Sequence, residues 1–169
     1  MNKTLKLVLF LAIISAISGL LIGSVNDLVE PKIEENALKA EESNLKLIFP
    51  NGDFEKIDFS DDTGVVTAVY KNDGGYVVKA TATGYNSSTP IIVLVGFDNE
   101  GTIIAVQTLQ QQETNGYGAR VFETDNLNSL YIGKDINTTV DMLTGATYTS
   151  TAMKQIMSTA QGIVKGLIG

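Results

Sequence analysis

The chain has 169 residues, a formal net charge of −7 and neither histidine nor cysteine. It therefore lacks the usual ligands of haem, thiolate iron–sulfur clusters and His/Cys zinc sites, and we expect no metal site. The same absence excludes Ser-His-Asp and Cys-His nucleophiles. Because haem and iron–sulfur centres lack their usual ligands, any redox chemistry would need an organic cofactor. Nucleic acid is not expected as a partner, because binding its phosphates requires a basic face.

The first segment is apolar. Residues 7–25 carry no charged side chain, and as a helix they would extend roughly 28 Å, close to the roughly 30 Å hydrocarbon core of a bilayer. Lys3 and Lys6 precede this run, and Asp27 and Glu30 follow it. The positive-inside rule then predicts a single-pass protein of the cytoplasmic membrane, with its N-terminus inside and the rest outside. A cleaved signal peptide is the alternative, but the run is longer than a usual signal core and lacks a clear cleavage site.

A second helix is predicted over residues 27–49. Pro31 would lie near its first turn, and a broken apolar stripe runs among charged residues. The turn-forming segment Pro50-Asn51-Gly52 then ends the helix. We expect this segment to connect the membrane to a folded domain.

Residues 53–109 have the period of β-strands. β-branched and aromatic runs alternate with turn-forming segments at residues 72–75, 84–90 and 98–101. The strands are expected around residues 65–70, 76–83, 91–97 and 102–109. Short turns of this kind join antiparallel neighbours, so the sheet should be mainly antiparallel.

The C-terminal part is predicted to be helical. One helix is expected between residues 119 and 131, and a clearer one over residues 149–168. Its apolar side chains recur at helical spacing and include methionines that should fill the core. These are Ala152, Met153, Ile156, Met157, Ala160, Ile163, Val164 and Leu167. The predicted fold is α+β, with a cytoplasmic N-terminus and transmembrane helix (1–26), a helical connector (27–52) and an extracytoplasmic domain (53–169) whose sheet is flanked by helices.

A hydroxyl-bearing turn precedes the last helix. It reads Thr144-Gly145-Ala146-Thr147 and follows Asp141. A helix N-terminus has unpaired N–H groups and a partial positive charge, so it accepts phosphate readily. Small residues at positions 145 and 146 leave the Thr147 hydroxyl accessible. The alternative is that Thr147 is an ordinary N-cap.

Three segments together resemble a known family. They are Gly84-Tyr85 with the strand region after it, Glu113-Thr114-Asn115-Gly116-Tyr117-Gly118, and the turn with Asp141. They are similar to the FMN-binding domain shared by the G subunit of Rnf complexes and the C subunit of sodium-pumping NADH:quinone reductases. The likeness covers roughly residues 76–165, and the chain length favours the Rnf subunit.

The resemblance implies a covalent cofactor. In that family a flavin transferase uses FAD to esterify the phosphate of FMN onto the last threonine of the motif, which is Thr147 here. Further cofactor-binding residues are then expected among the matching positions, with no catalytic residue. They are Tyr85, Glu113, Thr114, Gly116, Tyr117, Gly118, Asp141, Thr144, Gly145 and Ala146.

The chain departs from the family pattern in one loop. Asn115 stands where the family has proline, and Tyr117 where it has leucine; asparagine suits a turn that proline would rigidify. Tyr117 could stack on the flavin or pack against the sheet. Glu113 is either a solvated charge or a group that orients Thr114. Asp141 could cap the turn, serve recognition by the transferase, or do both.

These features favour a membrane-anchored flavoprotein that carries electrons within an Rnf-type ferredoxin:NAD oxidoreductase. It would be a redox subunit of a translocase, not catalytic alone, with other membrane subunits as partners. Alternatives are the equivalent subunit of a sodium-pumping NADH:quinone reductase and an exported carrier that serves an extracellular reductase alone. A structural ectodomain without flavin is a further alternative.

Overall fold

The computed structural model describes residues 2–169, with the side chains of residues 20–38 left undescribed. The chain divides into two compact units, Met1–Glu41 and Glu42–Gly169. The predicted divisions after residues 26 and 52 stay predictions.

The first helix, α1, runs without interruption over Lys3–Ile48. The predicted span and connector are therefore parts of one helix, and the placement of Pro31 at a first turn was wrong. Proline lacks an N–H group, so this helix forgoes one backbone hydrogen bond at that residue. Among the described residues, no helix combines the length and the apolar character that crossing a membrane requires. The predicted span ends in residues 20–25, whose side chains lie outside the described part, and it stays a prediction.

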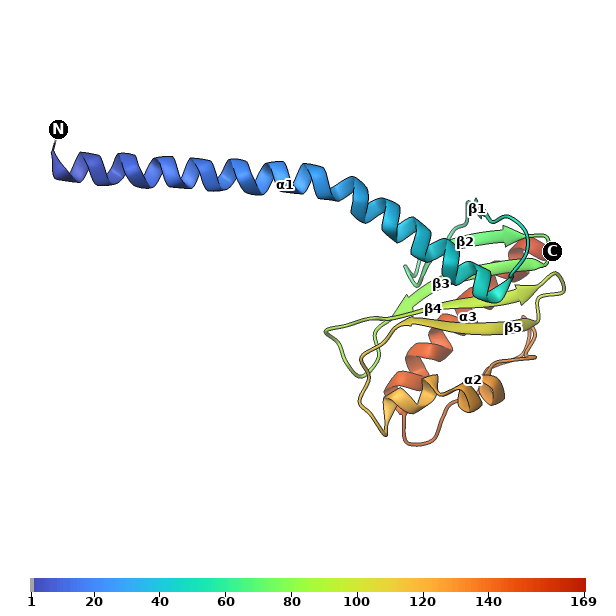
Figure 1. Ribbon diagram of the computed structural model, residues 1–169. Helices are drawn as coiled ribbons and strands as arrows, with labels where there is room; N and C mark the ends of the chain where they lie inside the picture. The colour runs from blue at the N-terminus through green and yellow to red at the C-terminus, as the bar shows by residue number, and fades with distance from the viewer. Residues whose placement is uncertain (1) are drawn as a thin grey trace. The chain divides into compact units, whose positions relative to one another are not determined.

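Five antiparallel strands form one sheet in the second unit, and their order in the sheet is their order in the chain (Figure 1). They are β1 (Glu55–Ile57), β2 (Val66–Asn72), β3 (Gly75–Ala82), β4 (Ile91–Asp98) and β5 (Ile103–Gln110). The expected antiparallel sheet and four of its strands are confirmed. The three-residue β1 was not predicted, because so short a segment shows no alternation.

Apolar residues cover both faces of the sheet. On one face, alternate residues of the central strands, such as Val93 and Val95, pack in a cluster with α3. On the other face, Leu94 joins a smaller cluster with Leu45 from the last turns of α1. Because β4 is buried on both sides, it reads as a continuous apolar run rather than as an alternating one.

Three helical elements follow the sheet in the chain. They are the 3₁₀ helix η1 (Gly118–Phe122), α2 (Thr124–Leu130) and α3 (Thr147–Ile168). Met153 and Met157 of α3 are fully buried, which confirms that they fill the core. Figure 1 shows α3 running along one face of the sheet. The α+β architecture is thus confirmed, and it brings the β3–β4 loop, the segment after β5 and the start of α3 to one end of the sheet.

Candidate functional site

The turn before α3 is held by backbone geometry and by Ser150. The Ala146 N–H donates to the Leu143 carbonyl at 3.2 Å, and Gly145 between them has a φ of +85°, a conformation that favours glycine. The buried Ser150 hydroxyl accepts from the Leu143 N–H at 3.1 Å. These bonds attach the turn to the first turn of the helix and so fix where Thr147 lies.

Ala146, not Thr147, is the N-cap of α3, and no side chain caps the helix. The N-cap interpretation of Thr147 was therefore wrong. Thr147 is the first helical residue, and its side chain is exposed. Within the described part of the chain, no acceptor binds the N–H groups of residues 147–149, while the Ser150 N–H donates to the Ala146 carbonyl. The helix thus begins with free donors, as an anion-binding N-terminus does.

Neighbouring hydroxyl groups differ from that of Thr147. The Thr149 hydroxyl is buried and donates to Glu113, and the Thr151 hydroxyl donates to the Thr147 carbonyl at 2.8 Å. The Thr147 hydroxyl has no hydrogen-bond partner among the described residues. Thr144 is also exposed, but it lies outside the cavity described below. Among the threonines of α3 and the turn before it, Thr147 is thus the one whose hydroxyl is both unengaged and at the cavity. Thr114, in the loop after β5, also lines the cavity but does not lie at a helix start.

The loop after β5 forms a tight turn. The Tyr117 N–H donates to the Thr114 carbonyl at 3.2 Å, and Gly116 has a φ of +76°. This is the pattern of a type II turn, in which proline is common at the second position and glycine at the third. Asn115 occupies the proline position, and the turn forms with it. Tyr117 is 67 % exposed, so it does not pack against the sheet.

Glu113 is buried and connects three segments. One carboxyl oxygen accepts from the Tyr85 N–H at 3.1 Å and from the Thr149 hydroxyl, and the other accepts from the Asn86 N–H at 3.1 Å. A Cβ atom on Gly84 or Gly118 would lie 2.6 or 2.7 Å from this carboxyl group. Only 6 % of Glu113 is exposed, so the solvated-charge interpretation was wrong, and its hydroxyl partner is Thr149 rather than Thr114.

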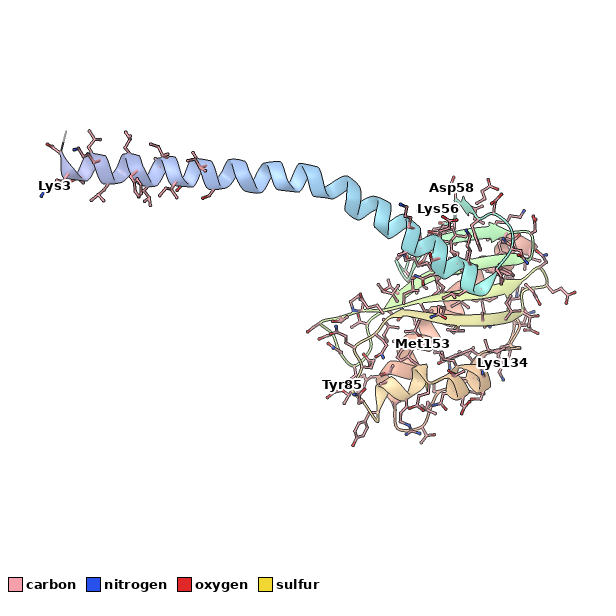
Figure 2. The ribbon with its side chains drawn as sticks, viewed as in Figure 1. Lys3, Lys56, Asp58, Tyr85, Lys134 and Met153 are labelled. Atoms are coloured by element: carbon pink, nitrogen blue, oxygen red, sulfur yellow. The ribbon has the colours of Figure 1, made fainter. Side chains whose placement is uncertain are left out.

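A cavity of about 470 Å³ lies where these segments meet. Its lining combines the β3–β4 loop, the segment after β5 and the start of α3: Tyr85, Thr114, Tyr117, Gly118, Gly145, Ala146, Thr147, Tyr148 and Thr149. All of these residues are uncharged. The volume falls in the range of roughly 300–1,000 Å³ that is usual for small-molecule sites. Figure 2 labels Tyr85 at this end of the domain and Lys134 at the opposite end.

The structure brings seven of the eleven predicted site residues to the cavity. Glu113 lies behind the lining, and Gly116 forms the adjoining turn. Asp141 and Thr144 are exposed residues outside the lining. Within the described part of the chain the Asp141 side chain forms no hydrogen bond, so it does not cap the turn, and its role in transferase recognition stays a prediction.

Two lining residues were missed by the sequence analysis. Tyr148 is 70 % exposed and Thr149 is 1 % exposed, although they are neighbours in the first turn of α3. Both directly follow the hydroxyl motif, which is the signal that could have indicated them. The direction in which the helix starts decides that the Tyr148 side chain is exposed at the cavity and that the Thr149 hydroxyl reaches Glu113.

The arrangement fits a ligand that has both a phosphate and a flat apolar part. Free N–H groups at a helix start suit the phosphate, and exposed tyrosines suit an aromatic ring. FMN has both parts. Among the described residues, no group of His, Cys, Asp or Glu side chains is arranged to hold a metal ion.

Comparison with known families agrees with this chemistry. The family model described as the FMN-binding domain matches residues 84–161, which include the whole cavity lining. No curated protein matches the chain. The match supports FMN as the ligand and a flavin-binding, redox role. The chain therefore contains a domain that matches the FMN-binding domain family over residues 84–161.

Proposed function

We propose that the protein is an electron carrier whose FMN is esterified through its phosphate to the Thr147 hydroxyl. The observation that carries the proposal is the state of Thr147. Its hydroxyl is unengaged, it lies at the cavity, and it stands on a helix start with three free N–H groups. A phosphate ester at this position would keep its negative charge beside those donors.

Attachment requires a flavin transferase with FAD as the donor. The Thr147 oxygen forms a bond to the phosphorus of the FMN moiety, the pyrophosphate bond breaks, and AMP leaves while the hydroxyl gives up its proton. Thr144, Gly145 and Thr147 are exposed in the turn at residues 144–147, which suits access by another protein. Asp141, which is exposed just before this turn, is the residue that we assign to recognition by the transferase.

Bound FMN would supply electron transfer, and the chain would supply position. Residues 147–149 offer donors to the phosphate, while Tyr85, Tyr117 and Tyr148 offer aromatic surface to the ring. Gly145, which has no side chain, lets the backbone come close to the ligand. The three tyrosines are themselves exposed, so a ring beside them would stay open in part to a redox partner.

We further propose that the carrier domain lies outside the cytoplasmic membrane, anchored by residues 7–25, in an Rnf-type complex. The uncharged run with lysines before it and acidic residues after it supports the anchor. Large apolar side chains of this run, from Leu7 to Ile17, are exposed in the described part of α1, as a lipid-facing helix requires. Partners would be the membrane subunits between which electrons pass.

The decisive experiment is the intact mass of the purified full-length chain. We expect the mass of one FMN ester and its loss in Thr147→Ala, while the Thr144→Ala and Thr151→Ala controls keep it. Peptide mass spectrometry should place the adduct on residue 147. An adduct on Thr144, Thr149 or Thr151 would overturn the assignment. Co-purification of integral membrane proteins with iron–sulfur absorbance would support a complex, whereas a chain that purifies alone favours an independent carrier.

A further inference from the structure

Two tyrosines from distant parts of the chain meet at the cavity. The ring centroids of Tyr85, in the β3–β4 loop, and Tyr148, in the first turn of α3, lie 5.9 Å apart with an angle of 59° between the planes. This is the tilted geometry that aromatic pairs prefer. The two residues are 68 % and 70 % exposed, so the pair leaves most of its apolar surface uncovered.

The spacing decides how a planar ligand can bind. Stacked carbon atoms approach to about 3.5 Å, so a ring held between two others needs centroids roughly 7 Å apart. At 5.9 Å and tilted, Tyr85 and Tyr148 leave no space for a third ring between them. They form one bent surface, so a planar ring that approaches from the side of the cavity can stack on the face of one tyrosine and meets the other at an angle.

Glu113 fixes the position of the backbone segments that carry the two tyrosines. The same carboxyl oxygen accepts from the Tyr85 N–H and from the hydroxyl of Thr149, the residue after Tyr148. Both tyrosines are thus attached through one buried group, although each side chain is exposed. The close approach of Gly84 and Gly118 to Glu113 leaves that group little room to move.

We propose that Tyr85 and Tyr148 form one aromatic wall against which the isoalloxazine ring of the flavin stacks, and that Glu113 is the positioning residue of this wall. The inference rests on the proposed function for the identity of the ligand. The two proposals have different requirements. The covalent attachment at Thr147, here called the tether, involves the phosphate, whereas the wall involves only the ring.

Riboflavin tests the wall without the tether, because it has the ring but no phosphate. The test uses the full-length Thr147→Ala chain, to which riboflavin is added while its fluorescence is followed. We expect saturable quenching, a Kd raised roughly threefold to tenfold by Tyr148→Leu or Tyr85→Leu, and a Kd within about twofold of the parent in Tyr148→Phe. The phenylalanine variant is the matched control, since it keeps the ring and loses only the hydroxyl.

Glu113 is tested by a double-mutant cycle. Glu113→Gln keeps the size of the side chain but removes one acceptor, so it should weaken riboflavin binding by a similar factor. If Glu113 acts through the wall, its effect should shrink when Tyr148 is already leucine. Equal effects of Glu113→Gln in both backgrounds would refute the positioning role, because a merely structural effect would not depend on Tyr148.

The outcomes separate the two proposals. Absence of saturable riboflavin binding, or a Tyr148→Leu variant that binds like its parent, overturns the wall even if the mass of wild type shows the ester. Absence of the ester overturns the tether, and the riboflavin titration then still decides the wall. Thermal unfolding of Tyr148→Leu should match the parent, since a side chain this exposed contributes little to the core.

Discussion

The two ends of the sheet are built differently. At the end formed by the β2–β3 and β4–β5 turns, polar groups bind one another: the Asn72 side chain accepts from the Gly74 N–H at 3.0 Å, and the Asp98 side chain accepts from the Glu100 and Thr102 N–H groups at 2.9 and 2.8 Å. At the other end, the N–H groups of residues 147–149 lack acceptors within the described part of the chain, and three tyrosines are exposed around a cavity.

The contrast shows what tight turns provide and what they prevent. A turn that satisfies its own donors stabilises a hairpin and leaves fewer donors for a ligand. The open end leaves donors and aromatic surface available, and it depends on the buried Glu113 to hold its loops together. Damage at the closed end should therefore affect stability alone, whereas damage at the open end should also affect the flavin.

The largest effect is expected for Gly75→Ala at the closed end. Gly75 has a φ of +147°, and a Cβ there would collide with the Phe97 carbonyl on β4. Strain and overpacking together should lower the free energy of unfolding by about 3 kcal/mol. Urea denaturation measures the loss, and the flavin spectrum of the remaining folded protein should not change. A loss below about 1 kcal/mol would show that the hairpin adjusts easily.

A smaller loss is expected for Gly118→Ala at the open end. The new Cβ would meet the Thr149 hydroxyl and lie 2.7 Å from the Glu113 carboxyl group, so the bonds of Glu113 must rearrange. We expect the free energy of unfolding to fall by about 2 kcal/mol and the absorbance or fluorescence of the flavin to change. The matched control is Gly116→Ala, two residues earlier, where a Cβ has open space and only the φ of +76° opposes it. If both variants have the same flavin spectrum, Glu113 does not shape the ligand site.

For Asp98→Ala we expect the free energy of unfolding to fall by about 1 kcal/mol, because the N–H groups of Glu100 and Thr102 lose their acceptor and bind water instead. Thermal unfolding measures it, and covalent flavin should be unaffected. Asp73→Ala in the neighbouring turn is the control, since in the described part of the chain its side chain makes no hydrogen bond. A change in flavin properties in the Asp98 variant would contradict the separation of the two ends.

The smallest effect concerns pH at the closed end. Asp135 lies in the segment that pairs with Ile103 through Gly133 and Lys134, and a hydrogen bond from the Asn137 N–H and another from the Thr138 hydroxyl lower the pKa of its carboxyl group. A lowered pKa means that the stabilisation is complete above the ordinary value of about 4 and is lost as the pH falls through the lowered one. Asp135→Asn should therefore flatten the dependence of Tm on pH below about 4. An unchanged slope would contradict the role of Asp135.

Much of the fold was predictable because its signals are local. The alternating strands, the turn residues between them and the apolar stripe of α3 each lie within a short window, and they indicated the antiparallel sheet. Pro31 misled the prediction, since its local preference for a first turn did not interrupt α1. Propensity is a weak guide where a long helix continues on both sides.

The site was predictable only in part, because its geometry depends on distant contacts. The resemblance to the FMN-binding domain indicated Thr147 and the loop at residues 113–118, and Thr147 lines one cavity with Thr114, Tyr117 and Gly118 of this loop. The bond between Glu113 and Thr149 joins residues 36 positions apart, and no local pattern signals it. The same holds for the contact between Tyr85 and Tyr148, which requires that the loop and the helix meet.

The strand order has a consequence for the sequence of folding events. Each strand pairs with its neighbour in the chain, so the sheet can form by closing short loops, which costs little entropy. The cavity requires three segments that are remote from one another, and it should be complete only after α3 docks. In the proposed maturation, a nascent or misfolded chain with an intact sheet would therefore present no proper acceptor. Flavin attachment would then mark chains that have finished folding.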